Sequence, residues 1–158
     1  MERALVVDTV NDLILTPRSP CADMLPVTVG RMMLTETLPA QMWLVAGTVP
    51  GALPFNHAHG LLIDQTPPQG TRATDQSDAW AVVTLAGPGA TDALARLATL
   101  NLRAMTDGQA TRSHIGHMPG HITRIAPDIW RLMVFRSMAA TLVRELTHAM
   151  HQVHARHG

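Results

Sequence analysis

The chain contains neither lysine nor tyrosine, so two side chains that often carry catalysis are missing. All twelve basic residues are arginine. The absence of lysine excludes a Schiff-base lysine and a phosphate-loop lysine, and the absence of tyrosine excludes a tyrosine acid or base. The single cysteine, Cys21, cannot form an internal disulfide bond, which fits a reducing compartment.

The chain also lacks charge runs and long apolar runs. Its twelve acidic and twelve basic residues give a net charge of zero, so nothing predicts steering toward nucleic acid or an anionic membrane. No apolar stretch approaches the roughly 20 residues that span a bilayer. Glu2, Asp8 and Asp12 interrupt the N-terminal segment too often for a signal peptide. We therefore expect a soluble cytoplasmic protein that binds neither nucleic acid nor a membrane.

The length and composition of the chain suffice for one folded domain. The 158 residues are 46% hydrophobic and 15% charged, which is typical of a globular protein of ordinary domain size. We predict a single domain over residues 1–158, with an irregular N-terminal segment, 1–40, and an α+β body, 41–158. In the N-terminal segment, residues 5–7 and 13–15 are candidate short strands, and three prolines at positions 17, 20 and 26 interrupt any longer element.

The first half of the body contains two predicted strands. Residues 41–47 form the first, a Pro- and Gly-rich loop follows to residue 60, and residues 61–64 form the second. A turn-rich segment then extends to residue 78, with no further strand expected in it.

The segment from Asp75 to Leu102 has the clearest pattern in the chain. The alternating side chains of residues 80–85 predict a strand, and both of its faces are expected to be partly buried. Gly87-Pro88-Gly89 ends this strand, and Pro88 suits the first turn of a helix. The buried face of that helix is predicted to comprise Ala90, Ala93, Leu94 and Leu97.

The C-terminal part contains three more strands and a second helix. Strands over residues 111–118 and 121–126 are predicted to meet at a tight turn, Pro119-Gly120, before a strand over Ile129–Phe135. Ser137 is a suitable N-cap for the helix, whose predicted buried residues are Leu142, Val143, Leu146, Met150 and Val153. Trp80 and Trp130 each begin a strand–turn–helix unit, and two such units around a shared antiparallel sheet give an α+β fold with helices packed on the sheet.

Histidines are the first candidates for chemistry. Two groups attract attention, one of His148, His151, His154 and His157 and the other of His114, His117 and His121. On a helix, steps of three residues carry the first group around about half of the circumference, so only adjacent pairs could share an ion. Residues 114 and 117 are an odd number apart and should point to opposite faces of a strand. Because no cysteine or acidic cluster completes either group, we predict exposed polar histidines and no metal site.

Three other features resemble sites but have simpler explanations. Gly87-Pro88-Gly89 could present backbone N–H groups to an anion, but it lacks the phosphate-loop pattern and Pro88 removes a donor, so we interpret it as a strand-to-helix turn. Asp75, Ser77 and Asp78 could supply a base, yet such residues commonly bond their own backbone in a turn. A lone cysteine without a partner base does not predict a thiol enzyme. We therefore predict no catalytic, cofactor-binding or metal-binding residue in this chain.

Taken in order, the motifs between about residues 60 and 150 resemble one protein family. They are Asp75-Gln-Ser77-Asp78-Ala-Trp80, Leu85-Ala-Gly87-Pro88-Gly89-Ala90, Leu94-Ala-Arg-Leu97, Arg112 followed by His117-Met118, the strand with Trp130, and Arg136-Ser137. Their order and spacing resemble the gamma subunit of heterotetrameric sarcosine oxidase and its N-methyl-amino-acid dehydrogenase relatives. Residues 1–40 depart from the family pattern.

The resemblance implies a fold like that of the folate-binding aminomethyltransferases, and a role as a packing partner. In such a complex the chain would be a non-catalytic structural subunit beside an alpha-type subunit, with beta and delta subunits also present. FAD, FMN, NAD, tetrahydrofolate and zinc would belong to the partner subunits. The complex would oxidise sarcosine or a related N-methyl amine and feed one-carbon units to tetrahydrofolate. The alternative is a stand-alone folate-binding or one-carbon-transfer protein in which Asp75 lies near the pterin.

Overall fold

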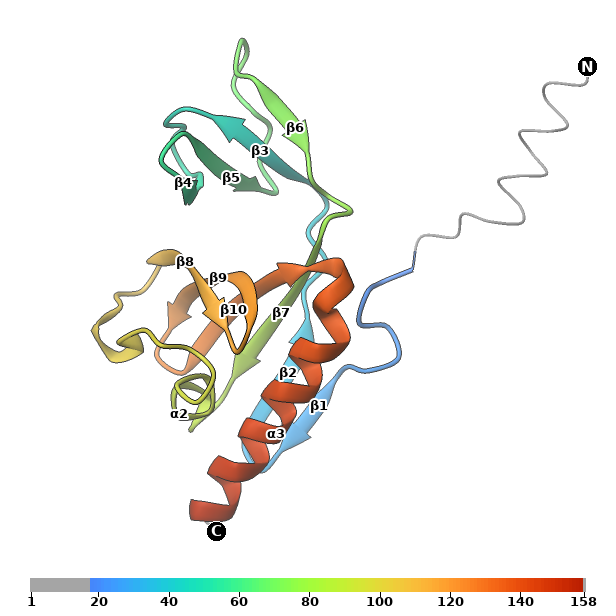
Figure 1. Cartoon of the computed structure of the whole chain (residues 1–158), viewed down its shortest axis with the longest axis vertical. Coiled ribbons are helices and arrows are strands. Elements are labelled where there is room, and N and C mark those ends of the chain that lie inside the picture. Colours follow the sequence, from blue (N-terminus) through green and yellow to red (C-terminus); the bar gives the residue numbers. More distant parts are fainter. Residues whose placement is uncertain (1–17, 158) are drawn as a thin grey trace, which may run out of the picture.

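The computed structural model describes residues 18–157, and its strands form two antiparallel sheets (Figure 1). The strand order is β1-β2-β7-β10-β9-β8 in the six-stranded sheet and β4-β5-β3-β6 in the four-stranded sheet. The strands are β1 (Val27–Val29), β2 (Met32–Glu36), β3 (Met42–Ala46), β4 (Leu53–Asn56), β5 (His59–Ile63), β6 (Ala73–Asp75), β7 (Trp80–Ala86), β8 (Ala110–Ile115), β9 (Met118–Ala126) and β10 (Ile129–Phe135). The helices are α2 (Ala90–Leu94) and α3 (Ala139–His157), with 3-10 turns η1 (Leu102–Ala104) and η2 (Arg136–Met138). The predicted α+β class is confirmed.

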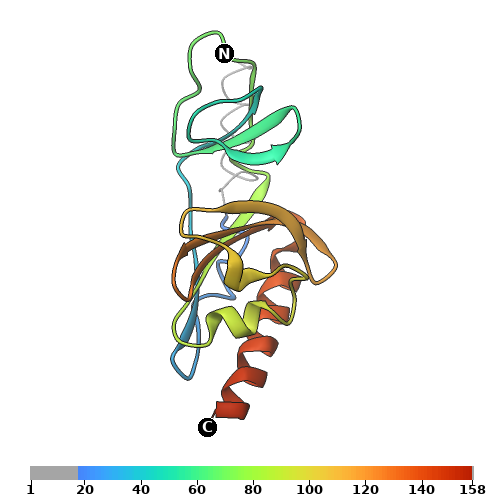
Figure 2. The ribbon, with the colours of Figure 1, turned by 90° about the vertical axis from the view of Figure 1, so that its left-hand side faces the viewer.

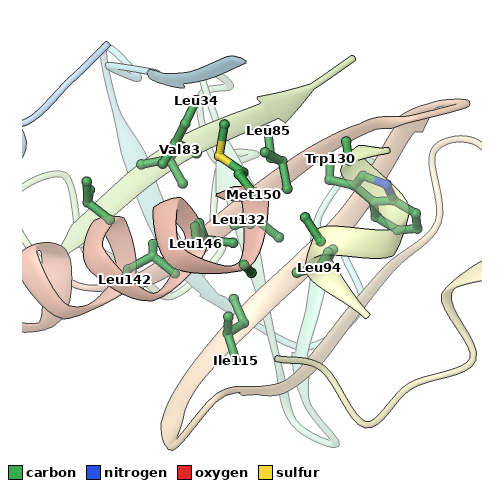
Figure 3. Close-up of a cluster of buried hydrophobic side chains, with 14 of the residues drawn as sticks. Leu34, Val83, Leu85, Leu94, Ile115, Trp130, Leu132, Leu142, Leu146 and Met150 are labelled. Atoms are coloured by element: carbon green, nitrogen blue, oxygen red, sulfur yellow. The ribbon is translucent and has the colours of Figure 1, made fainter. Parts of the chain in front are cut away.

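The main core lies between the two helices and one face of the six-stranded sheet. Figure 3 shows Leu142, Leu146 and Met150 of α3 directed into this cluster of apolar side chains. Buried positions recur every third or fourth residue along α3, at Ala139, Leu142, Val143, Leu146, Ala149, Met150 and Val153, so the predicted buried face is confirmed. Each fully buried leucine of this kind contributes about 1.5–3 kcal/mol. Within residues 18–157, no helix is long and apolar enough to cross a membrane.

The other face of the six-stranded sheet meets the four-stranded sheet. Along β7, Trp80 and Val82 point away from the helices and join Met133, Met42 and Leu61 in a second apolar cluster. Strand β7 is therefore buried on both faces, as its sequence pattern predicts. Figures 1 and 2 both place the four-stranded sheet at one end of the molecule and the C-terminal end of α3 at the other.

The predicted pair of strand–turn–helix units is also confirmed. Strands β7 and β10 are antiparallel neighbours, with Trp80 opposite Phe135, and each is followed by a helix on the same face of the sheet. Helix α2 is shorter than predicted because it ends at Leu94. Leu97 lies beyond the helix and packs against the core only partly.

The prediction of an irregular segment over residues 1–40 is wrong for residues 27–36. These residues form the hairpin of β1 and β2, and β2 pairs with β7, so that Leu34 is opposite Leu85. The hairpin has three- and five-residue strands, which are too short for a clear alternating pattern, and it turns at Gly30, which has a φ of 59°. The candidate strands at residues 5–7 and 13–15 lie outside the described residues.

The predicted turn at Pro119-Gly120 is a second correction. The β8–β9 connection is formed by Gly116 and His117, and β9 continues through Pro119 and Gly120. Proline is tolerated there because the pairing of β9 with β10 reaches only as far as Gly120, so the N–H that Pro119 lacks has no partner in β10. Glycine is needed because a Cβ on Gly120 would collide with the carbonyl oxygen of Met133 on the neighbouring strand.

The four-stranded sheet contains two strands that the sequence pattern hides. Strand β4 lies in the stretch expected to be a loop up to residue 60, and β6 lies in the turn-rich stretch before residue 78. They have four and three residues, and β4 contains Pro54, which suits an edge strand. The predicted strands at residues 41–47 and 61–64 correspond to β3 and β5. Ser137, predicted as an N-cap, lies within η2.

Candidate functional site

The contact between the two sheets brings together aromatic and polar side chains from five strands. We call Phe55, Trp80, Arg112, His121 and Phe135 the junction cluster. The His121 ring stacks on Phe55 with centroids 5.5 Å apart and an interplanar angle of 23°, and it meets Trp80 edge-on at 5.7 Å. Phe135 stacks on Trp80 at 4.7 Å. Arg112 places its Cζ atom 4.5 Å from the centre of the Phe55 ring, so a cation covers the outer side of the cluster.

Strand alternation and register place these side chains on one face. Along β9, Ile122 points into the helix-side core, so its neighbour His121 points to the junction. Arg112 of β8 is directly opposite His121, and Phe135 of β10 is directly opposite Trp80. Phe55 arrives from β4 of the other sheet, and Arg112 Nη1 donates a hydrogen bond to its carbonyl oxygen at 3.4 Å.

His121 is fully buried, with 0% of its surface exposed. Neither ring nitrogen has a hydrogen-bond partner among the described residues, and the same holds for Trp80 Nε1 and Thr123 Oγ1 nearby. Burial, together with the smaller effect of the positive charge of Arg112, lowers the pKa of His121 from 6.5 to about 4. The imidazole is therefore neutral at pH 7, and in this enclosed position it packs as an aromatic ring rather than reaching a substrate as an acid or base.

The other candidate histidines lie apart from this cluster. His114 is exposed on β8, His117 is exposed in the β8–β9 turn, and His148, His151 and His154 are exposed on α3. In the part of the chain that the structure describes, no three His, Cys, Asp or Glu side chains converge on a position that could hold a metal ion. The expectation of exposed histidines is therefore wrong only for His121 among these six, because the alternation of β9 turns that residue toward the second sheet.

Gly87-Pro88-Gly89 forms a strand-to-helix turn, as interpreted from the sequence. Gly87 N donates to Asp128 O at 3.0 Å, and α2 begins at Ala90, two residues after Pro88. The adjoining hollow of about 400 Å³ is lined by Gly30, Arg31, Met32, Pro88, Gly89, Asp92, Val153 and His154. The Asp92 carboxylate accepts a hydrogen bond from Arg103 Nη2 at 2.6 Å. An anion in the hollow would face that carboxylate, so the turn has a structural role.

Asp75 and Ser77 also hold a turn. Asp75 Oδ1 accepts hydrogen bonds from Ser77 Oγ at 2.6 Å and Ser77 N at 2.9 Å, and these bonds lower the pKa of Asp75. Ser77 Oγ in turn accepts a bond from Met42 N at 3.0 Å, which links the turn to β3. Asp78 is exposed beside them. The sequence-based interpretation of Asp75 and Ser77 as turn residues is confirmed.

Cys21 is buried, and its thiol is unreactive. Burial and the nearby Glu36 carboxylate raise the pKa of its thiol to about 11. The thiol is therefore protonated at neutral pH and is a poor nucleophile. The general prediction that the chain has no catalytic, cofactor-binding or metal-binding residue stays a prediction.

Sequence reasoning did not single out the junction cluster. Phe55 lies in the stretch expected to be a loop, and its contacts with His121 and Arg112 join distant parts of the chain. The usable signal was composition: the chain has only two phenylalanines, and both contact the Trp80 ring.

Comparison with solved structures finds chains of similar fold. The chain is similar to a chain of the heterotetrameric sarcosine oxidase from Corynebacterium sp. U-96 in complex with pyrrole 2-carboxylate, with a TM-score of 0.73 and 21% sequence identity. The similarity covers 87% of this chain and 96% of that chain. At this level of identity the comparison establishes a shared fold. No protein-family model and no curated protein matches the sequence.

Proposed function

We propose that the chain is a non-catalytic structural subunit of a multi-subunit flavoprotein complex that oxidatively demethylates sarcosine or a related N-methyl amine. The observation that carries this proposal is the shared fold with a chain of heterotetrameric sarcosine oxidase, which spans 96% of that chain. The ordered motifs from Asp75 to Ser137 support the same assignment because they follow the gamma-subunit pattern. In this proposal the flavins, NAD, folate site and zinc belong to the alpha, beta and delta partners.

The geometry of the chain supports a packing role. His121 is neutral and enclosed between two aromatic rings, Asp75 is engaged by Ser77, and the Cys21 thiol is protonated. These three groups therefore each have a structural environment instead of an open, poised one. A subunit that stabilises or positions its partners needs none of these groups to be reactive.

Co-purification from the native host tests the proposal. We expect an affinity-tagged copy of the chain to retain larger partner subunits through size-exclusion chromatography, with flavin absorbance in the same peak and turnover of sarcosine or another N-methyl amine. A chain that elutes alone, without flavin and without a partner detectable by mass spectrometry, would contradict the proposal. A tag on an unrelated cytoplasmic protein of similar size provides the control for nonspecific retention.

The stand-alone folate-binding alternative makes a different prediction. It requires Asp75 to be available to a pterin, whereas Asp75 Oδ1 holds the Ser77 turn. Fluorescence titration of the isolated chain with tetrahydrofolate separates the two functions. We expect no saturable binding; submicromolar binding that Asp75→Asn weakens would favour the alternative.

A further inference from the structure

An apolar row crosses the outer face of the six-stranded sheet, the face that points away from the helices. Met33 of β2 is opposite Ala86 of β7, Ala86 is opposite Ile129 of β10, and Ile129 is opposite Ala126 of β9. These four strands are consecutive neighbours in the sheet. Ile125 adjoins Ala126 where the pairing of β9 with β10 shifts its register. We call Met33, Ala86, Ile125, Ala126 and Ile129 the apolar row.

The direction of the apolar row follows from the alternation of side chains along each strand. Three residues next to the row on their strands belong to the helix-side core: Leu34, Leu85 and Trp130. Their neighbours in the row therefore point to the outer face, and directly paired residues share that face. On β9, Arg124 places its Cζ atom 5.9 Å from the centre of the Trp130 ring, so Arg124 is on the helix side and Ile125 points outward.

The apolar row is open among the described residues. Met33 is 45% exposed and Ile125 is 44% exposed, and they are two of the four exposed large hydrophobic residues there. No member of the row belongs to the apolar cluster beneath the four-stranded sheet, so that sheet leaves the row uncovered. From β2 to β9 the row crosses three strand spacings of about 4.8 Å, a width of about 14 Å. A contiguous apolar surface of this kind is typical of an interface, whereas singly scattered apolar residues need no partner.

A polar row lies beside the apolar row, two residues away along each strand. It comprises Thr35, Thr84, Arg131 and Thr123, which are paired in that order across β2, β7, β10 and β9. Arg131 is half-buried, its Nε atom has no hydrogen-bond partner among the described residues, and its guanidinium forms no salt bridge with them. Burial lowers the pKa of Arg131, and the charge of Asp64 offsets this effect only in part. Because neither row contains an acid, a cation without a paired anion stands at the edge of the apolar row.

We propose that the apolar row and Arg131 form a docking surface for an apolar element of another subunit that carries one carboxylate. The apolar side chains bury the row, and the carboxylate pairs with the guanidinium through charge-assisted hydrogen bonds. A half-buried guanidinium without an anion is unfavourable, so the assembled state gains from this pair as well as from the apolar contact. Methionine and arginine are both enriched at protein interfaces. The chemistry of the docking element stands on the two rows, and its identity as another subunit rests on the proposed function.

A second copy of this chain fits the surface less well. In a two-fold dimer both copies contribute the same patch, so each copy would offer Arg131 and no carboxylate to the other. The charge on this face therefore favours a partner of different sequence.

Methionine oxidation tests the inference, because Met33 is the one exposed methionine within residues 18–157. The isolated full chain and the complex retained by a tagged chain are treated with dilute hydrogen peroxide, and peptide mass spectrometry measures the sulfoxide at each methionine. We expect Met33 to oxidise in the isolated chain and about tenfold more slowly in the complex. Met138 of η2, which is half-buried and lies outside both rows, is the internal control and should oxidise at the same rate in both samples.

Competition between chains measures the two parts of the surface separately. Wild-type and variant chains are co-expressed in equal amounts with the partner subunits, and mass spectrometry gives their ratio in the purified complex. Ile125→Gln and Arg131→Gln should each be under-represented about five- to tenfold. The matched controls are Leu38→Gln, at an exposed apolar position outside the rows, and Arg72→Gln, at an exposed position of the β5–β6 connection; both should be incorporated equally with the wild type. Circular dichroism verifies that each variant is folded.

The contrary outcomes are distinct. Equal oxidation of Met33 in the chain and the complex, or equal incorporation of the Ile125 and Arg131 variants, would mean that the partner binds elsewhere. A dimeric isolated chain with Met33 protected would assign the surface to a second copy. A monomer in which Met33 is protected until residues 1–17 are removed would assign it to the chain's own N-terminal segment. If a complex is retained with Met33 exposed, only this inference fails; if no complex is retained in the host, the proposed function fails and this inference with it.

Discussion

His121 makes the junction cluster sensitive to acid. A neutral imidazole can pack between Phe55 and Trp80, but an imidazolium there would carry an unpaired buried charge beside the Arg112 cation. Burial depresses the pKa of His121 to about 4 in the folded state, against 6.5 for the exposed side chain. Between these values the unfolded chain binds the proton and the folded chain does not, so falling pH favours unfolding.

We therefore expect a pH-dependent loss of stability that His121→Leu removes. Its contribution is fully present above about pH 6.5 and is lost as pH falls toward 4, by about 2–3 kcal/mol between pH 7.5 and pH 4.5. Urea unfolding at these two pH values, followed by circular dichroism, measures the difference. Between these pH values, the free energy of unfolding should fall less for His121→Leu than for the wild type. The control His114→Leu, at an exposed position of β8, should lose as much as the wild type. Equal drops in all three proteins would contradict the assignment.

At the scale of single residues, the sequence predicts contacts between residues that are close along the chain. Asp75 and Ser77 are two residues apart, so their turn can be recognised from residue type alone. The junction cluster depends instead on where two sheets meet. Nothing in the local pattern of residues 118–126 indicates which face of β9 meets Phe55, and the mistaken turn at Pro119-Gly120 hid the alternation that buries His121.

The β1–β2 hairpin approaches the end of β7 so closely that one glycine is indispensable. Gly87 has a φ of 110°, and a Cβ at this position would collide with the carbonyl oxygen of Arg31. Backbone atoms cannot move aside as a flexible side chain can, so the hairpin or the β7–α2 turn would have to shift. Gly47 offers a comparison, because it has a φ of 81° with no atom within 4 Å of the corresponding Cβ.

We predict that Gly87→Ala is much more destabilising than Gly47→Ala. Both variants carry the backbone strain of a positive φ, about 1–2 kcal/mol, and only Gly87→Ala adds the collision, for a further 2 kcal/mol or so. Thermal unfolding followed by circular dichroism should show the larger decrease in melting temperature for Gly87→Ala. Similar decreases for the two variants would mean that the hairpin adapts freely and that the close approach does not restrain β7.

Elements with a long periodic pattern are predictable from this sequence, and short ones are not. Ile129–Phe135 and the buried face of α3 follow from alternation and from helical spacing over many residues. By contrast, β1, β4 and β6 have three or four residues each, fewer than two full alternations. These strands form because a neighbouring strand supplies their hydrogen bonds, and that neighbour is set by the tertiary fold.

The two sheets are joined through a shared layer of strands. Trp80, Val82 and Met133 project from β7 and β10 toward Met42 and Leu61, while the opposite faces of the same strands carry the helix-side core. The buried cluster beside the four-stranded sheet is shared between the two sheets. Of the five buried residues in this cluster, only Met42 and Leu61 come from the four-stranded sheet. A single cooperative domain over the described residues is therefore expected.

Hydrogen exchange at equilibrium tests this cooperativity and, with it, the predicted single domain. We expect the amides of the paired residues Leu44 and Leu61 in the four-stranded sheet to open with the same free energy as that of Leu132 in β10. Phe55→Ala removes the ring that bridges β4 to His121, so it should lower stability by about 2–3 kcal/mol and let the four-stranded sheet exchange before the larger one. Leu38→Ala is the control, because Leu38 is 69% exposed and lies outside both clusters. The opposite result would be a wild-type four-stranded sheet whose opening free energy lies more than about 2 kcal/mol below that of global unfolding. The chain would then comprise two folding units rather than one.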